Sequence, residues 1–252
     1  MSHSPPFVHD FSDAAEQYAA SRPKYPESLF RSVAALAPAT NGAWDCGTGN
    51  GQAAVGLAAH FESVYATDTS EEQIAQALPH PRIEYRVAPA EHSGLKDGSV
   101  DIVSVAQALH WFDLRPFYEE VRRVVRPGGL IAVYGYTWFY LTPALDELTN
   151  RWLLEPIEPY WSPKVRMLWD GYSTIDFPFE GLTAPALAVH LTWNLDELLS
   201  YYLTWSATRR KIANEGDDFL TAARAAFDAA WGVATERRHV VMPIAMRLGR
   251  LG

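Results

Sequence analysis

Short apolar runs alternate with helical patterns between residues 42 and 134, and this alternation constrains the fold more than any other feature. The runs that predict strands are Gly42–Cys46, Val64–Thr67, Ile83–Ala88, Val100–Ala106 and Leu130–Tyr134. The segments between them that predict helices are Gly51–His60, Glu71–Leu78, a short or irregular piece at Glu91–Leu95, and Leu114–Arg126. Strict alternation of strands and helices predicts an α/β protein with a doubly wound, mostly parallel sheet.

The alternation stops after Tyr136, and residues 137–184 are rich in proline and aromatic side chains. We interpret this segment as an aromatic-rich cap inserted into the domain. Order returns with a strand at Leu187–Trp193, a helix after the N-cap Asn194, a helix near Asp217–Trp231 and a last strand near His239–Leu248. We therefore expect one domain over residues 1–252, made of an N-terminal lid and helix (1–40), a core (41–136), the cap (137–184) and the C-terminal part of the core (185–252).

The charge of the chain limits which partners it is expected to bind, and its cysteine content indicates the cellular compartment. The chain has 30 acidic and 21 basic residues, a net charge of -9, which disfavours nucleic acid and anionic membranes as partners. Its single cysteine, Cys46, cannot form an intramolecular disulfide. We find no secretory signal in residues 1–13 and no apolar run of about 18 residues, so we expect a soluble cytoplasmic protein without a membrane span.

Three alternate glycines, Gly47, Gly49 and Gly51, follow the first strand and precede a helix. Glycine lets the backbone pass close beneath a ligand. The dinucleotide fingerprint needs a third glycine where this chain has Gln52, so the spacing fits a different ligand. Asp68 ends the second strand 21 residues after Gly47, close to the spacing of about 20 for an acid that binds a ribose hydroxyl. Together these features predict a bound nucleoside.

Simpler interpretations remain open for each residue taken alone. The glycines are also typical of a tight turn, and Asp68 is also typical of a helix N-cap or a solvated loop. His110, after the fourth strand, is a candidate general base, but it can equally be a hydrogen-bonded structural histidine. Trp111 is either core or pocket wall, and Cys46 is expected to be a small buried filler.

The chain resembles the class I S-adenosylmethionine-dependent methyltransferases and, more closely, a small-molecule branch that is similar to the trans-aconitate methyltransferases. The segments that carry the resemblance are Tyr18–Pro26, Asp45–Gln52, Asp68, Ala90–Glu91, Gln107–Asp113 and Arg126–Gly129, the last interpreted as a sharp turn. These motifs are specific for the superfamily and weak for the substrate. The fold expected is Rossmann-like, with seven strands and an antiparallel C-terminal strand.

The resemblance implies a set of residues that bind the cofactor. Gly47, Thr48 and Gly49, preceded by Asp45, would line its methionine part, and Asp68 would take its ribose. The residues expected around the adenine are Thr69, Ser70, Ala90 and Glu91, and those at the methionine end are Gln107 and Ala108. Tyr18 and Arg22 resemble lid residues that close over the cofactor, with Arg22 as a partner of its carboxylate.

The function implied is transfer of a methyl group from S-adenosylmethionine to a small molecule, with a carboxylate as one candidate acceptor group. The acceptor would lie between the cofactor and the aromatic cap, near His110, Trp111, Trp138 and Trp169, and no metal is predicted. His110 would act as the base if the acceptor were a hydroxyl or an amine. The alternatives are a non-catalytic relative that binds S-adenosylmethionine and a nicotinamide-dependent oxidoreductase. The choice of O-, N- or C-methylation and the oligomeric state stay open.

Overall fold

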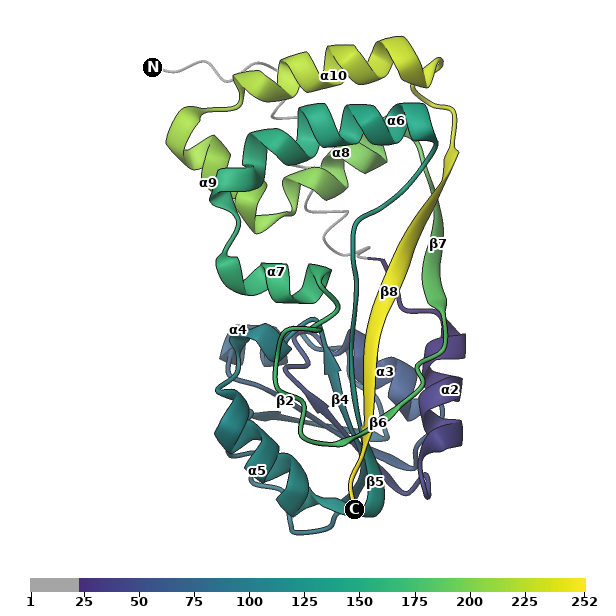
Figure 1. Ribbon diagram of the computed structural model, residues 1–252, viewed down its shortest axis with the longest axis vertical. Coiled ribbons are helices and arrows are strands. Elements are labelled where there is room, and N and C mark those ends of the chain that lie inside the picture. Colours follow the sequence, from purple (N-terminus) through teal and green to yellow (C-terminus); the bar gives the residue numbers. More distant parts are fainter. Residues whose placement is uncertain (1–22) are drawn as a thin grey trace. The chain divides into compact units, whose positions relative to one another are not determined.

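The computed structural model of the protein describes residues 23–252, which divide into two compact units (Figure 1). The sheet unit consists of Tyr25–Thr137, Met167–Ala188 and Pro243–Gly252. The helical unit consists, within the described residues, of 23–24, Trp138–Arg166 and Val189–Met242. The predicted lid residues Tyr18 and Arg22 lie outside the described residues.

The described residues contain one eight-stranded sheet with the order β3-β2-β1-β4-β5-β8-β6, in which β7 also pairs with β8. The strands are β1 Gly42–Cys46, β2 Ser63–Asp68, β3 Ile83–Val87, β4 Val100–Ala106, β5 Val125–Tyr136, β6 Glu180–Leu182, β7 Leu187–Trp193 and β8 Arg238–Arg250. Strands β1 to β5 pair in parallel, and β8 is antiparallel to β5 and β6. The α/β class and the antiparallel C-terminal strand are thus confirmed. The expected count of seven strands is wrong, because β6 has only three residues and is too short to show a pattern.

The helices of the sheet unit precede β1, as α2 does, or connect its parallel strands. They are α2 Glu27–Leu36, α3 Gln52–Ala58, α4 Glu71–Ala75, the 3-10 turn η1 Leu109–Trp111 and α5 Leu114–Val124. In Figure 1, α5 and α2 lie on opposite sides of the strands. The Arg126–Gly129 segment, predicted as a sharp turn, instead belongs to β5. There the register with β4 shifts, and Gly128 has a φ of 75°.

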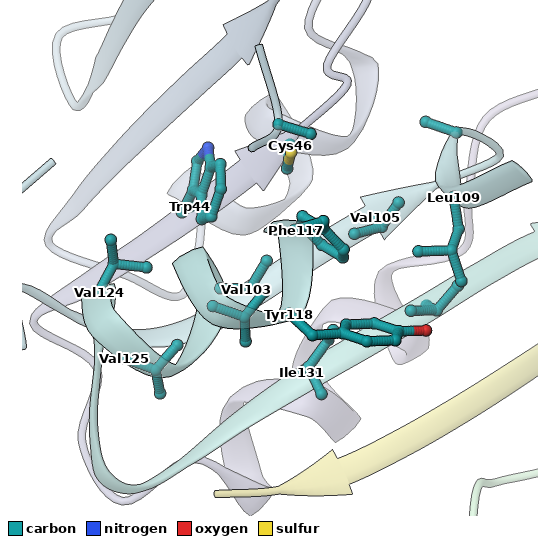
Figure 2. Packing of buried hydrophobic residues seen from close by; sticks show 14 of the residues in the cluster. Trp44, Cys46, Val103, Val105, Leu109, Phe117, Tyr118, Val124, Val125 and Ile131 are labelled. Carbon is teal, nitrogen blue, oxygen red and sulfur yellow. The ribbon is translucent and has the colours of Figure 1, made fainter. Parts of the chain in front are cut away.

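The hydrophobic core of the sheet unit lies between α5 and the sheet. Figure 2 shows Phe117 and Tyr118 of α5 beside Val103 of β4 and Ile131 of β5. Cys46 is buried in the same cluster, which confirms its expected role as a filler. Burial of each large apolar side chain stabilises the fold by about 1.5–3 kcal/mol.

One residue of α5 departs from the amphipathic pattern. The pattern places Glu120 on the water-facing side of the helix, whereas its side chain is buried. Its Oε1 accepts a hydrogen bond from the backbone N–H of Ser93 at 2.8 Å, and Arg123 donates to both carboxylate oxygens. These bonds compensate for the burial of the charge, and they lower the pKa of Glu120 against the opposing effect of burial, which raises it.

Helices dominate the other unit. They are α6 Pro143–Leu148, the π-helical turn η2 Thr149–Leu154, the 3-10 helix η3 Glu155–Tyr160, α7 Pro163–Trp169, which ends in the sheet unit, α8 Leu195–Leu203, α9 Ser206–Glu215 and α10 Asp218–Trp231. Asn194 caps α8 as predicted, since its side chain accepts from the N–H of Glu197 and the Glu197 side chain accepts in return. No helix within residues 23–252 is long and apolar enough to cross a membrane.

The boundaries of the two units differ from the boundaries expected for the cap and for the C-terminal part of the core. Residues 167–184 lie in the sheet unit, because Leu168 and Tyr172 are buried in its hydrophobic core. Residues 189–242 belong to the helical unit together with residues 138–166. The reason is that helix α10 packs on α6, η2 and α8 through an apolar face that includes Phe227 and Trp231. The single core segment expected at 185–252 is therefore distributed over both units.

Candidate active site

The carboxyl ends of three neighbouring parallel strands bring most of the predicted site residues to one edge of the sheet. Strand β1 pairs with β2 on one side and with β4 on the other. The segments that leave these strands are 47–51, 68–70 and 107–111. Open α/β sheets bind ligands at this edge, where parallel strands end.

The glycine loop combines a tight turn with open space. Gly47, Gly49 and Gly51 have φ values of 70°, 55° and 89°, a region that favours glycine. A Cβ on Gly47 would lie 2.6 Å from Cβ of Ala108, and a Cβ on Gly51 would lie 2.4 Å from the Tyr85 hydroxyl. A Cβ on Gly49 would meet only the Gln73 side chain, at 3.6 Å. The backbone at Gly49 is therefore open to a close ligand.

Asp68 joins the glycine loop to the end of β2. Its Oδ2 accepts a hydrogen bond from the N–H of Gly49 at 2.8 Å, and its Oδ1 accepts from the N–H of Ser70 at 2.9 Å. The N-cap of α4 is Ser70, whose hydroxyl accepts from the N–H of Gln73. Asp68 is thus not the helix N-cap. A carboxylate oxygen has more than one acceptor site, so these bonds leave capacity for a ligand hydroxyl.

Asp45 is fully buried beneath this loop. Its Oδ2 accepts from the Thr48 hydroxyl at 2.6 Å, and its Oδ1 accepts from the Ser104 hydroxyl at 3.2 Å. Ser104 is the register partner of Asp45 across β1 and β4, and its Oγ lies 2.8 Å from the hydroxyl of Tyr134 on β5. The pKa of Asp45 is raised to about 6. Burial is the largest cause and the charge of Asp68 adds to it, whereas these hydrogen bonds oppose the increase.

Gln107 holds a strained position just after β4. Its φ is 53°, its N–H donates to the carbonyl of Tyr134 at 2.8 Å, and its side-chain amide donates to the hydroxyl of Tyr25 at 3.2 Å. The Tyr25 ring packs edge-on against Tyr134, with 5.0 Å between centroids. Burial raises the pKa of the Tyr25 phenol well above its ordinary value, so the phenol stays protonated.

The remaining predicted cofactor residues lie on neighbouring segments. Ala90 is buried after β3, and Oε1 of Glu91 accepts from the N–H of Asp113 at 2.9 Å, which fixes this segment to the start of α5. Thr69 is exposed beside Ser70. Among residues 23–252, no three His, Cys, Asp or Glu side chains gather in a group that would hold a metal ion.

The predicted acceptor residues lie in both units. His110 is buried in the sheet unit, and its Nδ1 lies 3.0 Å from the hydroxyl of Tyr172. Trp111 is 53% exposed and is therefore not a core residue, and Trp169 packs partly buried against the core of the same unit. Trp138 belongs to the helical unit, where its ring lies 5.8 Å from that of Trp161.

Comparison with known proteins identifies the family. A family model described as a methyltransferase domain matches residues 44–133. A Dictyostelium discoideum protein named as a methyltransferase is 32% identical over 218 residues, which cover 85% of this chain and 83% of that protein. The chain belongs to the S-adenosylmethionine-dependent methyltransferases.

Two further relatives agree with this assignment. A structure described as a type II methyltransferase from Anaeromyxobacter dehalogenans is 44% identical, with a TM-score of 0.87 over 91% of this chain and 97% of that chain. A Saccharomyces cerevisiae protein named as an S-adenosylmethionine-dependent methyltransferase is 30% identical over 131 residues, which cover 48% of this chain and 44% of that protein. The family decides for a methyltransferase over the nicotinamide-dependent oxidoreductase.

The residues at the strand ends fit the cofactor of this family. The backbone at Gly49 is open, which suits a ligand in close contact. The polar groups there are the Asp68 carboxylate, the Ser70 hydroxyl and the Gln107 amide. These groups are complementary to the hydroxyls, the ammonium and the carboxylate of S-adenosylmethionine.

The raised pKa of Asp45 predicts how stability changes with pH. Above about pH 6 the folded protein holds a buried charge, and as the pH falls through this value the folded carboxyl gains a proton before the unfolded one does. As the pH is lowered from about 7.5 to about 5.5, the free energy of unfolding of the wild type should therefore rise by about 1 kcal/mol relative to that of Asp45→Asn. Urea denaturation at several pH values measures this difference.

The matched control is Asp97→Asn, which makes the same chemical change at a carboxylate that is 82% exposed. The prediction for Asp45 fails if the stability curves of the wild type and Asp45→Asn run parallel over this range.

Proposed function

We propose that this methyltransferase transfers the methyl group to a small molecule that bears a carboxylate, as in the branch that resembles the trans-aconitate methyltransferases. The observation that carries the proposal is the loop after β4, where buried His110 and exposed Trp111 lie within four residues of the proposed cofactor residues Gln107 and Ala108. A histidine among aromatic side chains gives the apolar lining and the few polar groups that are typical of small-ligand sites.

The proposed cofactor site follows the predicted residues. Asp68 binds the ribose, Gly47 to Gly49 border the methionine part, and Asp45 holds this loop from below. The residues proposed around the adenine are Thr69, Ser70, Ala90 and Glu91, and those at the methionine end are Gln107 and Ala108. Tyr18 and Arg22 remain proposed lid residues.

The chemistry requires little from the protein beyond alignment. When bound, S-adenosylmethionine supplies a methyl carbon on a positively charged sulfur, which leaves with the bonding electron pair. A carboxylate oxygen that forms the new bond to this carbon loses its negative charge, and no proton moves. The residues of the site hold the acceptor oxygen in line and exclude water, which can supply about 7–11 kcal/mol of the barrier reduction.

The proposed acceptor residues of the sheet unit are His110, Trp111 and Trp169. Arg166 is a further basic side chain that could bind the carboxylate, but its guanidinium donates to Glu158 at 2.5 Å in the helical unit. His110 is therefore the better-supported partner. The net charge of -9 supports a small acceptor over nucleic acid. Location in the cytoplasm stays a prediction from the sequence.

The cofactor site is tested by valine at Gly49. Its Cβ and methyl groups would fill the open space beside the loop, so we expect Gly49→Val to lose calorimetric binding of S-adenosylmethionine and S-adenosylhomocysteine. Gly98→Val is the control, since Gly98 has nearly the same φ, 53° against 55°, and open space around it, but lies before β4 at the opposite edge of the sheet. Wild-type affinity in Gly49→Val would contradict the assignment.

The acceptor class is tested with a panel of organic acids, phenols and amines, with trans-aconitate among the acids. We expect methylation of a carboxylic acid by the wild type. We expect Trp169→Ala to lower kcat/KM for that acid while cofactor affinity stays unchanged. Methylation of a protein or nucleic acid in preference to every small acceptor would overturn the proposal.

A further inference from the structure

Two residues with strained backbone conformations lie close to the predicted acceptor residue His110. Within residues 23–252, the non-glycine residues with positive φ are Gln107 and Tyr172, at 53° and 56°. Gln107 lies three residues before His110, and the hydroxyl of Tyr172 lies 3.0 Å from Nδ1 of His110. Such strained residues persist only where the surrounding structure holds them, and they are frequent at functional sites.

Several contacts hold Tyr172 in this conformation. Its N–H donates to the carbonyl of Met167 at 2.7 Å. The guanidinium of Arg247 donates to the carbonyls of Tyr172 and Ile175, at 2.6 and 3.1 Å, and lies 4.5 Å from the centroid of the Phe177 ring. The Tyr172 side chain is buried, and its ring stacks on that of His110. The loop therefore fixes the phenol against one nitrogen of His110.

The hydrogen bond between Tyr172 and His110 can run in either direction, and its direction depends on the tautomer of His110. Burial raises the pKa of Tyr172 above its ordinary value, so its phenol keeps the proton. A neutral imidazole has one donor and one acceptor nitrogen, and the bond at one nitrogen sets the role of the other. A phenol O–H that donates to Nδ1 leaves the imidazole proton on Nε2.

We propose that Tyr172 is a positioning residue that fixes His110 as the tautomer protonated at Nε2, so that His110 donates a hydrogen bond to a carboxylate of the acceptor. This inference rests on the proposed function, and it assigns His110 a binding role in place of the role of base. In the transfer, one carboxylate oxygen forms the bond to the methyl carbon as the carbon–sulfur bond breaks, and the electron pair stays on sulfur. The Nε2–H group holds the carboxylate, and no proton leaves His110.

The test is the ¹⁵N NMR spectrum of His110 in the full-length protein, assigned by loss of its signals in His110→Gln. In the wild type we expect a pyridine-type shift for Nδ1 and a pyrrole-type shift for Nε2. In Tyr172→Phe we expect both shifts to move toward the average of the two tautomers. The control is Tyr118→Phe, because the Tyr118 hydroxyl donates to the carbonyl of Asp176 in the same loop. Its His110 shifts should match the wild type.

The kinetic test uses the best carboxylic acid of the panel. We expect Tyr172→Phe to lower kcat/KM for this acid about five- to tenfold, with the affinity for S-adenosylhomocysteine unchanged, as for loss of one hydrogen bond. His110→Gln keeps an N–H donor but no base, so it should retain more activity than His110→Ala.

The inference is overturned if Nδ1 carries the proton in the wild type, or if Tyr172→Phe leaves the His110 shifts unchanged. Neither result depends on finding an acceptor. Failure to bind S-adenosylhomocysteine or to methylate any small molecule would instead contradict the proposed function, so the two failures are distinguishable.

Discussion

The buried carboxylate of Asp45 links the sheet to the glycine loop. It accepts hydrogen bonds from Thr48 in the loop and from Ser104 on β4, and Ser104 in turn contacts Tyr134 on β5. A buried carboxylate without such donors would be costly, so the loop and the strands hold one another in place. The glycine loop therefore takes its shape from three strands and not only from its glycines.

A second carboxylate, Asp68, connects the ends of β1 and β2. It accepts from the backbone N–H groups of Gly49 and Ser70, which keeps the glycine loop turned toward the predicted ribose position. The order β2-β1-β4 places Gln107 and His110 on the other side of this loop. The site thus depends on strand order, which brings together residues from about 45 to 110.

The local pattern of the sequence predicted most of the sheet unit and less of the rest. Strands β1, β4 and β7 have the predicted bounds, because each is an apolar run of sufficient length. Strand β6 and helix α9 were missed. The first is three residues long, and the second has few buried residues, Ala207 and Thr208. That the glycine loop and Asp68 lie together at neighbouring strand ends could be predicted, because their spacing is local.

The supporting residues were missed for a different reason. Ser104 and Tyr134 are polar residues within apolar strands, which was the one available signal, and their partners come from other strands. Tyr172 lies 62 residues after His110, and no local pattern connects them. Trp161 and Trp169 both lie in the expected cap segment, yet they fall in different units of the structure.

Calorimetric titration of the wild type and Asp68→Ala with S-adenosylhomocysteine tests the central claim that the cofactor is held at the ends of β1 and β2. The account predicts binding to the wild type and weaker binding to the variant by about 1.5–3 kcal/mol, the loss of a hydrogen bond to a charged group. Glu72→Ala, which removes an exposed acid of α4, should bind as the wild type does. Equal affinity of the wild type and Asp68→Ala, or no binding by the wild type, would contradict the account.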